Sequence, residues 1–297
     1  MKAIDDIRGV LVVGAGTLGL RIALRCALDG YKVTMYDISE KQISTALDMQ
    51  SHLIKSYLKK GILDQDMLTK AEENLTTSTN LAEACKGVDL ISESIIENID
   101  IKKQFYKGLM EYVDDGVIIT TNTSYLLPSD LVGSVNQPDH FCALHFHDVF
   151  NQRVVDIMPH SGTAQWVNDV LIEFGRRIHQ IPVFIKKESS GYIFNSMLMA
   201  ILGQAGSLAV NDVGSIQDID RSFMGNFGTP IGPFGMMDQV GLDTAHHIVS
   251  VRTDRKSVEF AAFIKDYIEQ GKLGFKTGEG FYKYPNPEFM SHDFLKP

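Results

Sequence analysis

Short apolar runs alternate with helix-like patterns through the first half of the chain. Residues 9–14, GVLVVG, have the length and branched side chains of a buried strand, and residues 18–28 repeat apolar positions with a helical period. Strands that alternate with helices predict βαβ units and a mostly parallel sheet, and therefore an α/β fold. Further strands are expected at the apolar runs 31–37, 88–92, 116–121, 141–146 and 153–158.

An insertion interrupts this alternation between residues 39 and 76. Its pattern predicts two helices with a break near Gly61. The spacing leaves two interpretations open, because such a pair either lines a ligand cleft or consists of two solvated helices that only pack. The first helix is expected to have one apolar face, formed by Ile43, Ala46, Leu47, Leu53, Ile54 and Leu58.

The pattern changes after residues 181–191, beyond which only helical patterns follow. We therefore expect a sheet-containing domain at residues 1–187 and an all-α domain at residues 188–297. The second domain has too few helices to cover its own apolar faces, so it should pack on the first domain, on a second copy, or on both. A homodimer formed through this domain is expected. Its helices are predicted near 192–211, 215–225, 237–252 and 256–270.

Composition excludes several classes of protein. The chain has 297 residues, 44% hydrophobic and 22% charged, which is ordinary for a globular protein of two domains. Its net charge of −9 argues against a general nucleic-acid binder. No apolar run approaches the roughly 18 residues of a membrane span. The three cysteines, Cys26, Cys85 and Cys142, are too scattered for a disulfide framework, which favours a reducing, cytoplasmic location.

A glycine-rich turn follows the first predicted strand. Gly14, Gly16 and Gly19 form the pattern G-x-G-x-x-G, with Thr17 and Leu18 inside it at the start of a predicted helix. In this strand–turn–helix context the glycines permit a tight turn, a close approach of the backbone to a pyrophosphate, and close helix–strand packing. The helix N-terminus attracts phosphate. The sequence thus predicts a Rossmann-type dinucleotide-binding domain.

Asp37 indicates which dinucleotide this domain binds. It ends the second predicted strand, where a carboxylate accepts hydrogen bonds from ribose hydroxyls and repels a 2′-phosphate. No arginine follows in DISEK, although Lys41 is present. NAD is therefore favoured over NADP.

A pair of histidines lies near the end of the predicted sheet. His145 and His147 are two residues apart on one strand, so they should share a face, and Asp148 and Asp156 follow. The pair could ligate a metal ion with a third ligand. One histidine could instead be a general base oriented by a carboxylate, for which Asp156 is the candidate. Both could also be structural. We expect no metal, because hydride transfer with NAD does not require one.

Several segments together resemble the 3-hydroxyacyl-CoA dehydrogenase family, particularly its 3-hydroxybutyryl-CoA members. The resemblance covers nearly the whole chain and is most specific in the last two segments. It implies reversible, NAD-dependent oxidation of the 3-hydroxyl of an acyl-CoA in fatty acid metabolism. The segments are VVGAGTLGLRIA (12–23), ESIIENIDIKKQFY (93–106), TNTSYL (121–126), SSGYIFNSMLMA (189–200), GTPIGPFGMMDQVGLD (228–243) and GKLGFKTGEGFYKY (271–284).

The resemblance implies roles for matching residues. His145 matches the base that takes the hydroxyl proton, and Asp156 stands where the family has a glutamate partner. Ser124 matches the serine that binds the substrate oxygen, and Asn195 an asparagine that faces the substrate from the helical domain. The helical pair at 39–76 corresponds to an arm over the CoA moiety. Positions lining the nicotinamide half of the cofactor site are Glu97, Lys102 and Asn122.

The chain departs from the family pattern at the histidines. The family has H-F-F-N-P where this chain has His145, Phe146, His147, Asp148 and Val149. Asp156 is one methylene shorter than the family's glutamate, and the segment between the histidine and this acid is one residue shorter. The shorter segment either brings Asp156 close enough to contact His145 or leaves the contact between the two side chains looser. Two other departures, outside this stretch, are Ser190 for proline and Ser196 for arginine.

Three functions remain open from the sequence. The first is a dehydrogenase of a short-chain 3-hydroxyacyl-CoA. The second is a dehydrogenase of a free polar hydroxy compound, as in the related gulonate and carnitine dehydrogenases, since His147 and Asp148 add polar groups beside the base. The third is a non-catalytic NAD-binding protein.

Overall fold

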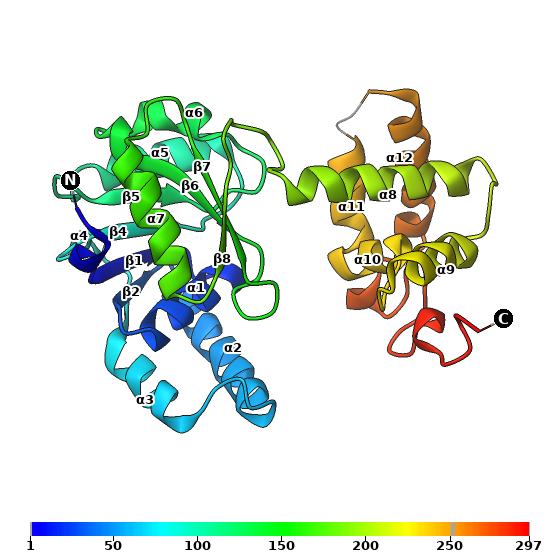
Figure 1. The fold of residues 1–297 in the computed structure, drawn as a ribbon, viewed down its shortest axis with the longest axis horizontal. Helices are drawn as coiled ribbons and strands as arrows, with labels where there is room; N and C mark the ends of the chain where they lie inside the picture. The colour runs from blue at the N-terminus through cyan, green and yellow to red at the C-terminus, as the bar shows by residue number, and fades with distance from the viewer. Residues whose placement is uncertain (1, 251–252, 297) are drawn as a thin grey trace. The chain divides into compact units, whose positions relative to one another are not determined.

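The computed structural model describes residues 2–250 and 253–296 (Figure 1). The chain divides into two compact units, Met1–Ile193 and Phe194–Pro297. The change in composition near residue 187 lies in the segment that leads from the last strand of the first unit into the first helix of the second.

The first unit contains an eight-stranded sheet in the order β3-β2-β1-β4-β5-β6-β7-β8, within the described residues. Neighbouring strands are parallel except β6 and β7, which are antiparallel. This confirms the predicted mostly parallel α/β architecture. The strands are β1 (Gly9–Val13), β2 (Lys32–Tyr36), β3 (Leu75–Ser78), β4 (Leu90–Glu93), β5 (Ile118–Thr121), β6 (Phe141–Phe146), β7 (Val154–Pro159) and β8 (Ile181–Phe184).

The pattern of apolar runs missed the two edge strands. β3 is largely polar, with the sequence LTTS and no buried residue. β8 contains Pro182, which lacks a backbone donor and is tolerated at a sheet edge. β3 therefore lacks the apolar signal of the buried strands, whereas β8 is a short apolar run, IPVF, that was not among the expected strands.

Helices cover both faces of the sheet (Figure 1). In β1, Val10 and Val12 pack in one core cluster with residues of α1 and α7, whereas Leu11 and Val13 pack in a second cluster with residues of α5. This explains why the strand is apolar at every position. The helices of this unit are α1 (Thr17–Leu28), α2 (Glu40–Lys59), α3 (Gln65–Asn74), α4 (Leu81–Ala84), α5 (Ile99–Leu109), α6 (Pro128–Leu131) and α7 (Gln165–Arg177).

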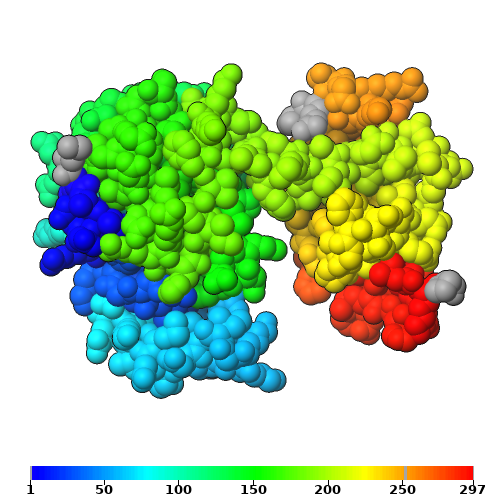
Figure 2. Space-filling view, viewed as in Figure 1, coloured from blue at the N-terminus to red at the C-terminus, as the bar shows by residue number. Residues whose placement is uncertain are grey.

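The predicted helical insertion is confirmed as α2 and α3, shown in blue to cyan at the margin of the first unit in Figure 2. Gly61 lies between them with φ of 66°. The predicted apolar face is only partly correct. Tyr57, which the prediction did not include, is buried on this face, whereas Leu47 and Leu58 are 40% and 36% exposed. The helix therefore packs through a narrower stripe than the pattern indicated.

The second unit is helical and has its own core, which includes Phe234 and Phe260. The single helix predicted at 237–252 is wrong, because Gly241, with φ of 100°, separates two helices there. Residues 251 and 252 of that prediction lie outside the described residues. The helices are α8 (Phe194–Val210), α9 (Ile216–Phe227), α10 (Pro233–Val240), α11 (Leu242–Ser250) and α12 (Arg255–Glu269).

In the described part of the chain, no helix combines the length and apolar character needed to cross a membrane. The three cysteines are buried and unpaired, and all belong to the first unit.

Candidate active site

The glycine-rich turn joins β1 to α1, as predicted. Gly14 has φ of 99°, and a Cβ atom there would lie 2.6 Å from the carbonyl oxygen of Ser94. A Cβ atom on Gly19 would lie 1.9 Å from the carbonyl oxygen of Gly14, so the helix packs directly on the turn. At Gly16, in contrast, a Cβ atom would meet nothing within 4 Å. The backbone is therefore open at the position where a pyrophosphate would approach, beside Thr17 and Leu18 at the start of α1.

Asp37 follows β2 and faces this turn. One carboxylate oxygen accepts a hydrogen bond from the backbone nitrogen of Ala15 at 3.0 Å, and the other accepts one from Ser39 at 3.0 Å. The carboxylate thus fixes the end of β2 against the turn. The open backbone at Gly16 and the acid at the end of β2 together fit NAD.

β6 and β7 bring the predicted base and its partner together. His145 and Asp156 stand directly opposite each other in the antiparallel register. The His145 Nδ1 atom lies 3.1 Å from Asp156 Oδ2, and its Nε2 atom lies 3.2 Å from the hydroxyl of Ser124. Both His145 and Asp156 are buried. The shorter carboxylate therefore reaches the imidazole, because the register places their Cβ atoms close together.

The ionisation of Asp156 determines where the imidazole proton lies. Burial raises the pKa of Asp156, but hydrogen bonds from His145 and His147 outweigh it and hold the pKa below its ordinary value. An ionised carboxylate only accepts hydrogen bonds, so His145 must carry its hydrogen on Nδ1. Its Nε2 lone pair then faces the Ser124 hydroxyl and is available to accept a proton.

His147 contacts the same carboxylate oxygen. Its Nε2 atom lies 2.8 Å from Asp156 Oδ2, and its ring centroid lies 4.7 Å from that of His145. The predicted common face of the two histidines is confirmed. The donor atoms of these three side chains lie within 4.8 Å of one another, which is the donor set of the metal alternative.

Asp148 serves a different purpose. It forms an ion pair of 2.6 Å with Arg21 of α1, and it accepts hydrogen bonds from the backbone nitrogens of Phe150 and Asn151. These bonds hold the pKa of Asp148 below its ordinary value despite partial burial. Asp148 therefore ties the loop between β6 and β7 to the helix that begins at the glycine-rich turn.

Glu97 and Asn122 brace the loop that carries Ser124. The Glu97 carboxylate accepts hydrogen bonds from the backbone nitrogen of Ser124 at 3.0 Å and from the hydroxyl of Thr123. Asn122 accepts a hydrogen bond from the backbone nitrogen of Phe146 at 2.8 Å. The ends of β5 and β6 are thereby held together around the serine–histidine contact.

Lys102, predicted to line the cofactor site, is buried beneath the surface. It is 1% exposed, and its ammonium lies 2.5 Å from the carboxylate of Glu93, which is fully buried. Glu93 also accepts hydrogen bonds from Tyr106 and Thr121 at 2.8 Å. Because Lys102 lies 3.5 Å from Glu97 as well, it connects the buried pair to the Ser124 loop.

Tyr192 belongs to the site but was not predicted. Its ring stacks on His145 with centroids 4.7 Å apart and planes at 27°. Its hydroxyl donates a hydrogen bond of 2.9 Å to the carbonyl of Thr123. Tyr192 has φ of 52° after Gly191, whose φ is 78°. The only signal in the sequence was an aromatic residue after a glycine in SSGY, which also fits an ordinary turn.

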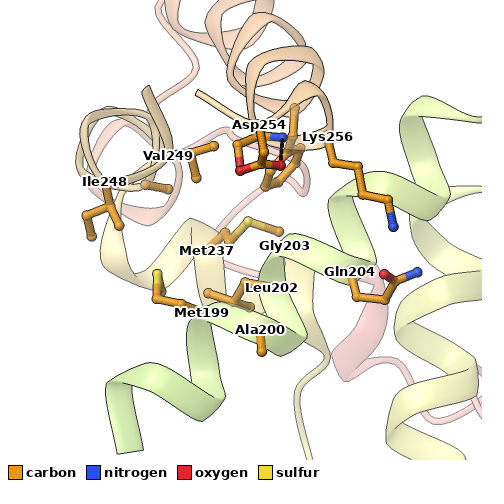
Figure 3. A pocket seen from close by; sticks show the side chains of 13 residues that line it. Met199, Ala200, Leu202, Gly203, Gln204, Met237, Ile248, Val249, Asp254 and Lys256 are labelled. Carbon is orange, nitrogen blue, oxygen red and sulfur yellow. Dashed lines mark hydrogen bonds between the residues drawn. The ribbon is translucent and has the colours of Figure 1, made fainter. Parts of the chain in front are cut away.

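Asn195 lies in the first turn of α8, in the second unit, and its role stays a prediction. That unit contains a pocket of about 200 Å³ between α8, α10, α11 and α12 (Figure 3). Met199, Met237 and Val249 supply apolar lining, and Lys256 lies at its edge. None of the predicted catalytic residues lines this pocket.

The fold and these contacts define a two-unit, NAD-binding oxidoreductase. Residues 9–189 match the NAD-binding domain of 3-hydroxyacyl-CoA dehydrogenase, and residues 191–284 match its C-terminal domain. The chain belongs to the 3-hydroxyacyl-CoA dehydrogenase family, and its cofactor is NAD. It is 30% identical to the mitochondrial hydroxyacyl-coenzyme A dehydrogenase of Rattus norvegicus over 288 residues, which cover 94% of this chain and 91% of the rat protein.

Solved structures agree with this assignment. A diketoreductase described as acting on dicarbonyl compounds has a TM-score of 0.88 and 38% identity, covering 96% of this chain and all of that one. The (S)-3-hydroxybutyryl-CoA dehydrogenase of Ralstonia eutropha has a TM-score of 0.85 and 27% identity, covering 94% of this chain and all of that one.

Proposed function

We propose that the chain oxidises and reduces C3 of a short-chain 3-hydroxyacyl-CoA, with His145 as the base. The observation that carries this proposal is the hydrogen-bonded series Ser124–His145–Asp156, with contacts of 3.2 and 3.1 Å. β1, β4, β5 and β6 are parallel neighbours, so the glycine-rich turn and Ser124 lie at the same edge of the sheet. Ligands bind at this edge in open α/β sheets.

The proposed chemistry divides between the cofactor and the side chains. NAD, when bound, accepts the hydride that leaves C3. His145 Nε2 takes the hydroxyl proton, while Ser124 donates a hydrogen bond to the substrate oxygen. The negative charge of Asp156 stabilises the imidazolium that forms, and its hydrogen bond fixes the orientation of the ring. In the reverse direction the imidazolium returns the proton.

Roles at the other predicted residues follow from their contacts. Glu97 and Asn122 would orient the Ser124 loop toward the nicotinamide half of the cofactor, and Lys102 would hold Glu97 in place. Asn195 would face the substrate from the helical unit. Asp37 would bind the adenosine ribose.

The substrate is tested by NADH consumption with acetoacetyl-CoA. Turnover is expected, and it should be lost when the thioester is replaced by free acetoacetate. If the protein binds NADH but does not turn over acetoacetyl-CoA, the substrate assignment is wrong. If acetoacetyl-CoA is turned over, acyl-CoA substrates of increasing chain length define the preferred length.

A second candidate is the reduction of a dicarbonyl compound that carries no CoA. It is favoured by the 38% identity to the diketoreductase and by the additional polar residue His147 beside the base. A dicarbonyl compound without CoA, assayed beside acetoacetyl-CoA, separates the two candidates. A higher kcat/KM for the compound without CoA would replace the thioester in this proposal.

We also propose a cytoplasmic homodimer formed through the helical unit. Apolar side chains are exposed on and beside α8 and α9, including Ile201 at 38%, Val213 at 68% and Phe227 at 69%. They border a groove of about 780 Å³ with mostly apolar walls. Exposed apolar patches of this kind mark association surfaces. Light scattering at micromolar concentration should give the mass of a dimer, and a monomer would contradict the proposal.

A further inference from the structure

We propose that His147 is a positioning residue that holds the Asp156 carboxylate in place for His145. This inference rests on the proposed base function of His145. The contact that motivates it is the hydrogen bond of 2.8 Å between His147 Nε2 and Asp156 Oδ2. It is shorter than the 3.1 Å contact from His145 Nδ1 to the same oxygen.

The backbone explains why the two imidazoles meet at one atom. His145 and His147 project from the same face at the end of β6, and His147 still bonds through its backbone nitrogen to the carbonyl of Val154 at 3.3 Å. Asp156 lies across from His145, so His147 is its diagonal neighbour on the same face. An imidazole is long enough to span that diagonal.

The carboxylate needs a second donor because it is buried. Asp156 is 1% exposed, and a buried anion is costly unless several hydrogen bonds stabilise it. Within the described residues, the two imidazoles are the side-chain donors to Asp156. With one donor, the carboxylate could rotate about its terminal bond and exchange its oxygens. A second N–H group on the same oxygen restricts that rotation and keeps Oδ2 facing His145.

The pairing also fixes hydrogen positions. Because the ionised carboxylate only accepts, His147 must carry a hydrogen on Nε2, just as His145 carries one on Nδ1. Through Nε2, His147 is therefore a donor to the partner of the base. Its effect should fall on the rate of proton transfer rather than on substrate binding.

Two variants separate this role from simple packing. His147→Phe keeps an aromatic ring but removes the donor, whereas His147→Gln places an amide donor near the position of Nε2. We expect His147→Phe to lower kcat by about 10- to 100-fold with KM changed less than about threefold, as for a misplaced catalytic group. His147→Gln should recover most of the lost kcat. Equal losses in both variants, or an unchanged kcat in His147→Phe, would overturn the proposal.

A third variant tests whether a longer carboxylate at position 156 can contact His145 without a donor at position 147. In His147→Phe combined with Asp156→Glu, the longer carboxylate can approach His145 without help, and kcat should rise above that of His147→Phe alone. Asp156→Glu by itself should lose activity, because the longer side chain moves the carboxylate oxygen out of the position that both imidazole nitrogens share. Additive losses in the double variant would contradict the proposed coupling.

A readout that needs no substrate keeps this test independent of the proposed reaction. Imidazole ¹⁵N resonances of His145 in the NADH-bound protein should show the Nδ1–H form in the wild type and in His147→Gln, and a mixture of forms in His147→Phe. The same pattern in all three proteins would refute the positioning role. A wild-type protein inactive on every substrate would instead count against the reaction while leaving this measurement valid.

Discussion

His145 is held on three sides by side chains from three parts of the chain. Asp156 contacts Nδ1, Ser124 contacts Nε2, and Tyr192 covers a ring face. Such a ring has little freedom to reorient, so its Nε2 atom stays directed at the Ser124 hydroxyl. General-base catalysis by a fixed imidazole contributes roughly 10²- to 10⁴-fold to a rate.

Replacement of His145 by alanine should lower kcat by about 10²- to 10⁴-fold and leave NADH affinity unchanged, because the glycine-rich turn is untouched. Steady-state kinetics and NADH fluorescence titration measure the two effects. His292→Ala, at an exposed histidine of the second unit, is the matched control. Comparable activity of His145→Ala and this control would show that the base lies elsewhere.

The sequence predicted some of these contacts and not others. Alternation along a strand placed His145 and His147 on one face, and the family resemblance pointed to Asp156 and Ser124. The stacking of Tyr192 could not be predicted, because it depends on left-handed backbone at Gly191 and Tyr192. Glu93 was missed because a buried acid within an apolar strand has no periodic signal, and only its partners Lys102 and Tyr106 explain it.

At the scale of elements, strongly periodic segments were predicted well and junctions were not. The buried strands and the pair α2 and α3 follow directly from apolar spacing. The division of the predicted helix 237–252 depends on one glycine, whose effect is visible only in the backbone angle of Gly241. The register of β6 against β7 depends on the length of the connecting loop, so it too required the structure.

The turn between β1 and α1 offers a paired test of cofactor binding. Gly16→Ala adds a methyl group in open space with φ of −77°, so the fold should be unchanged while NADH affinity falls about tenfold or more. Gly19→Ala places that methyl group against the carbonyl of Gly14 and should lower the melting temperature as well. Thermal melts and NADH titrations distinguish the variants. Wild-type affinity in Gly16→Ala would contradict a pyrophosphate at this turn.

α10 is tied to residues 281–284 by a buried acid. Asp238 accepts hydrogen bonds of 2.8 Å from the backbone nitrogens of Phe281 and Tyr282, and one of 3.1 Å from the hydroxyl of Tyr284. Burial raises the pKa of Asp238 from 3.8 to about 6 despite these bonds. The folded state therefore binds a proton more tightly than the unfolded chain does.

This shift makes the stability of the helical unit depend on pH. The contribution of Asp238 is greatest below pH 3.8 and is lost as pH rises through about 6, at roughly 1.4 kcal/mol per pH unit within that window. Hydrogen–deuterium exchange of peptides covering α10 should therefore accelerate across this range beyond the intrinsic effect of pH. Asp238→Asn should flatten the dependence, whereas the exposed Asp266→Asn should not. An unchanged dependence in Asp238→Asn would assign it to another group.

At the scale of the molecule, each unit has its own hydrophobic core. The sheet of the first unit is covered by two apolar clusters, and the helices of the second surround a third. The sequence predicted a boundary near residue 187 from the change of alternating patterns to helical ones, because a parallel sheet and a helical bundle need different periodicities, and the compact units divide between Ile193 and Phe194. Composition could not indicate which faces of the helical unit remain exposed.

Because the cysteines are buried, the rate of thiol modification should report how fast the first unit opens. Burial raises the pKa of Cys85 to about 11 and raises those of Cys26 and Cys142 further, so the native thiols are protonated and shielded. All three lie in the first unit. Alkylation by iodoacetamide should therefore proceed only as fast as that unit opens, and bound NADH should slow it. Cys142 lies on the same strand as His145, so its labelling rate reports how often β6 itself becomes exposed.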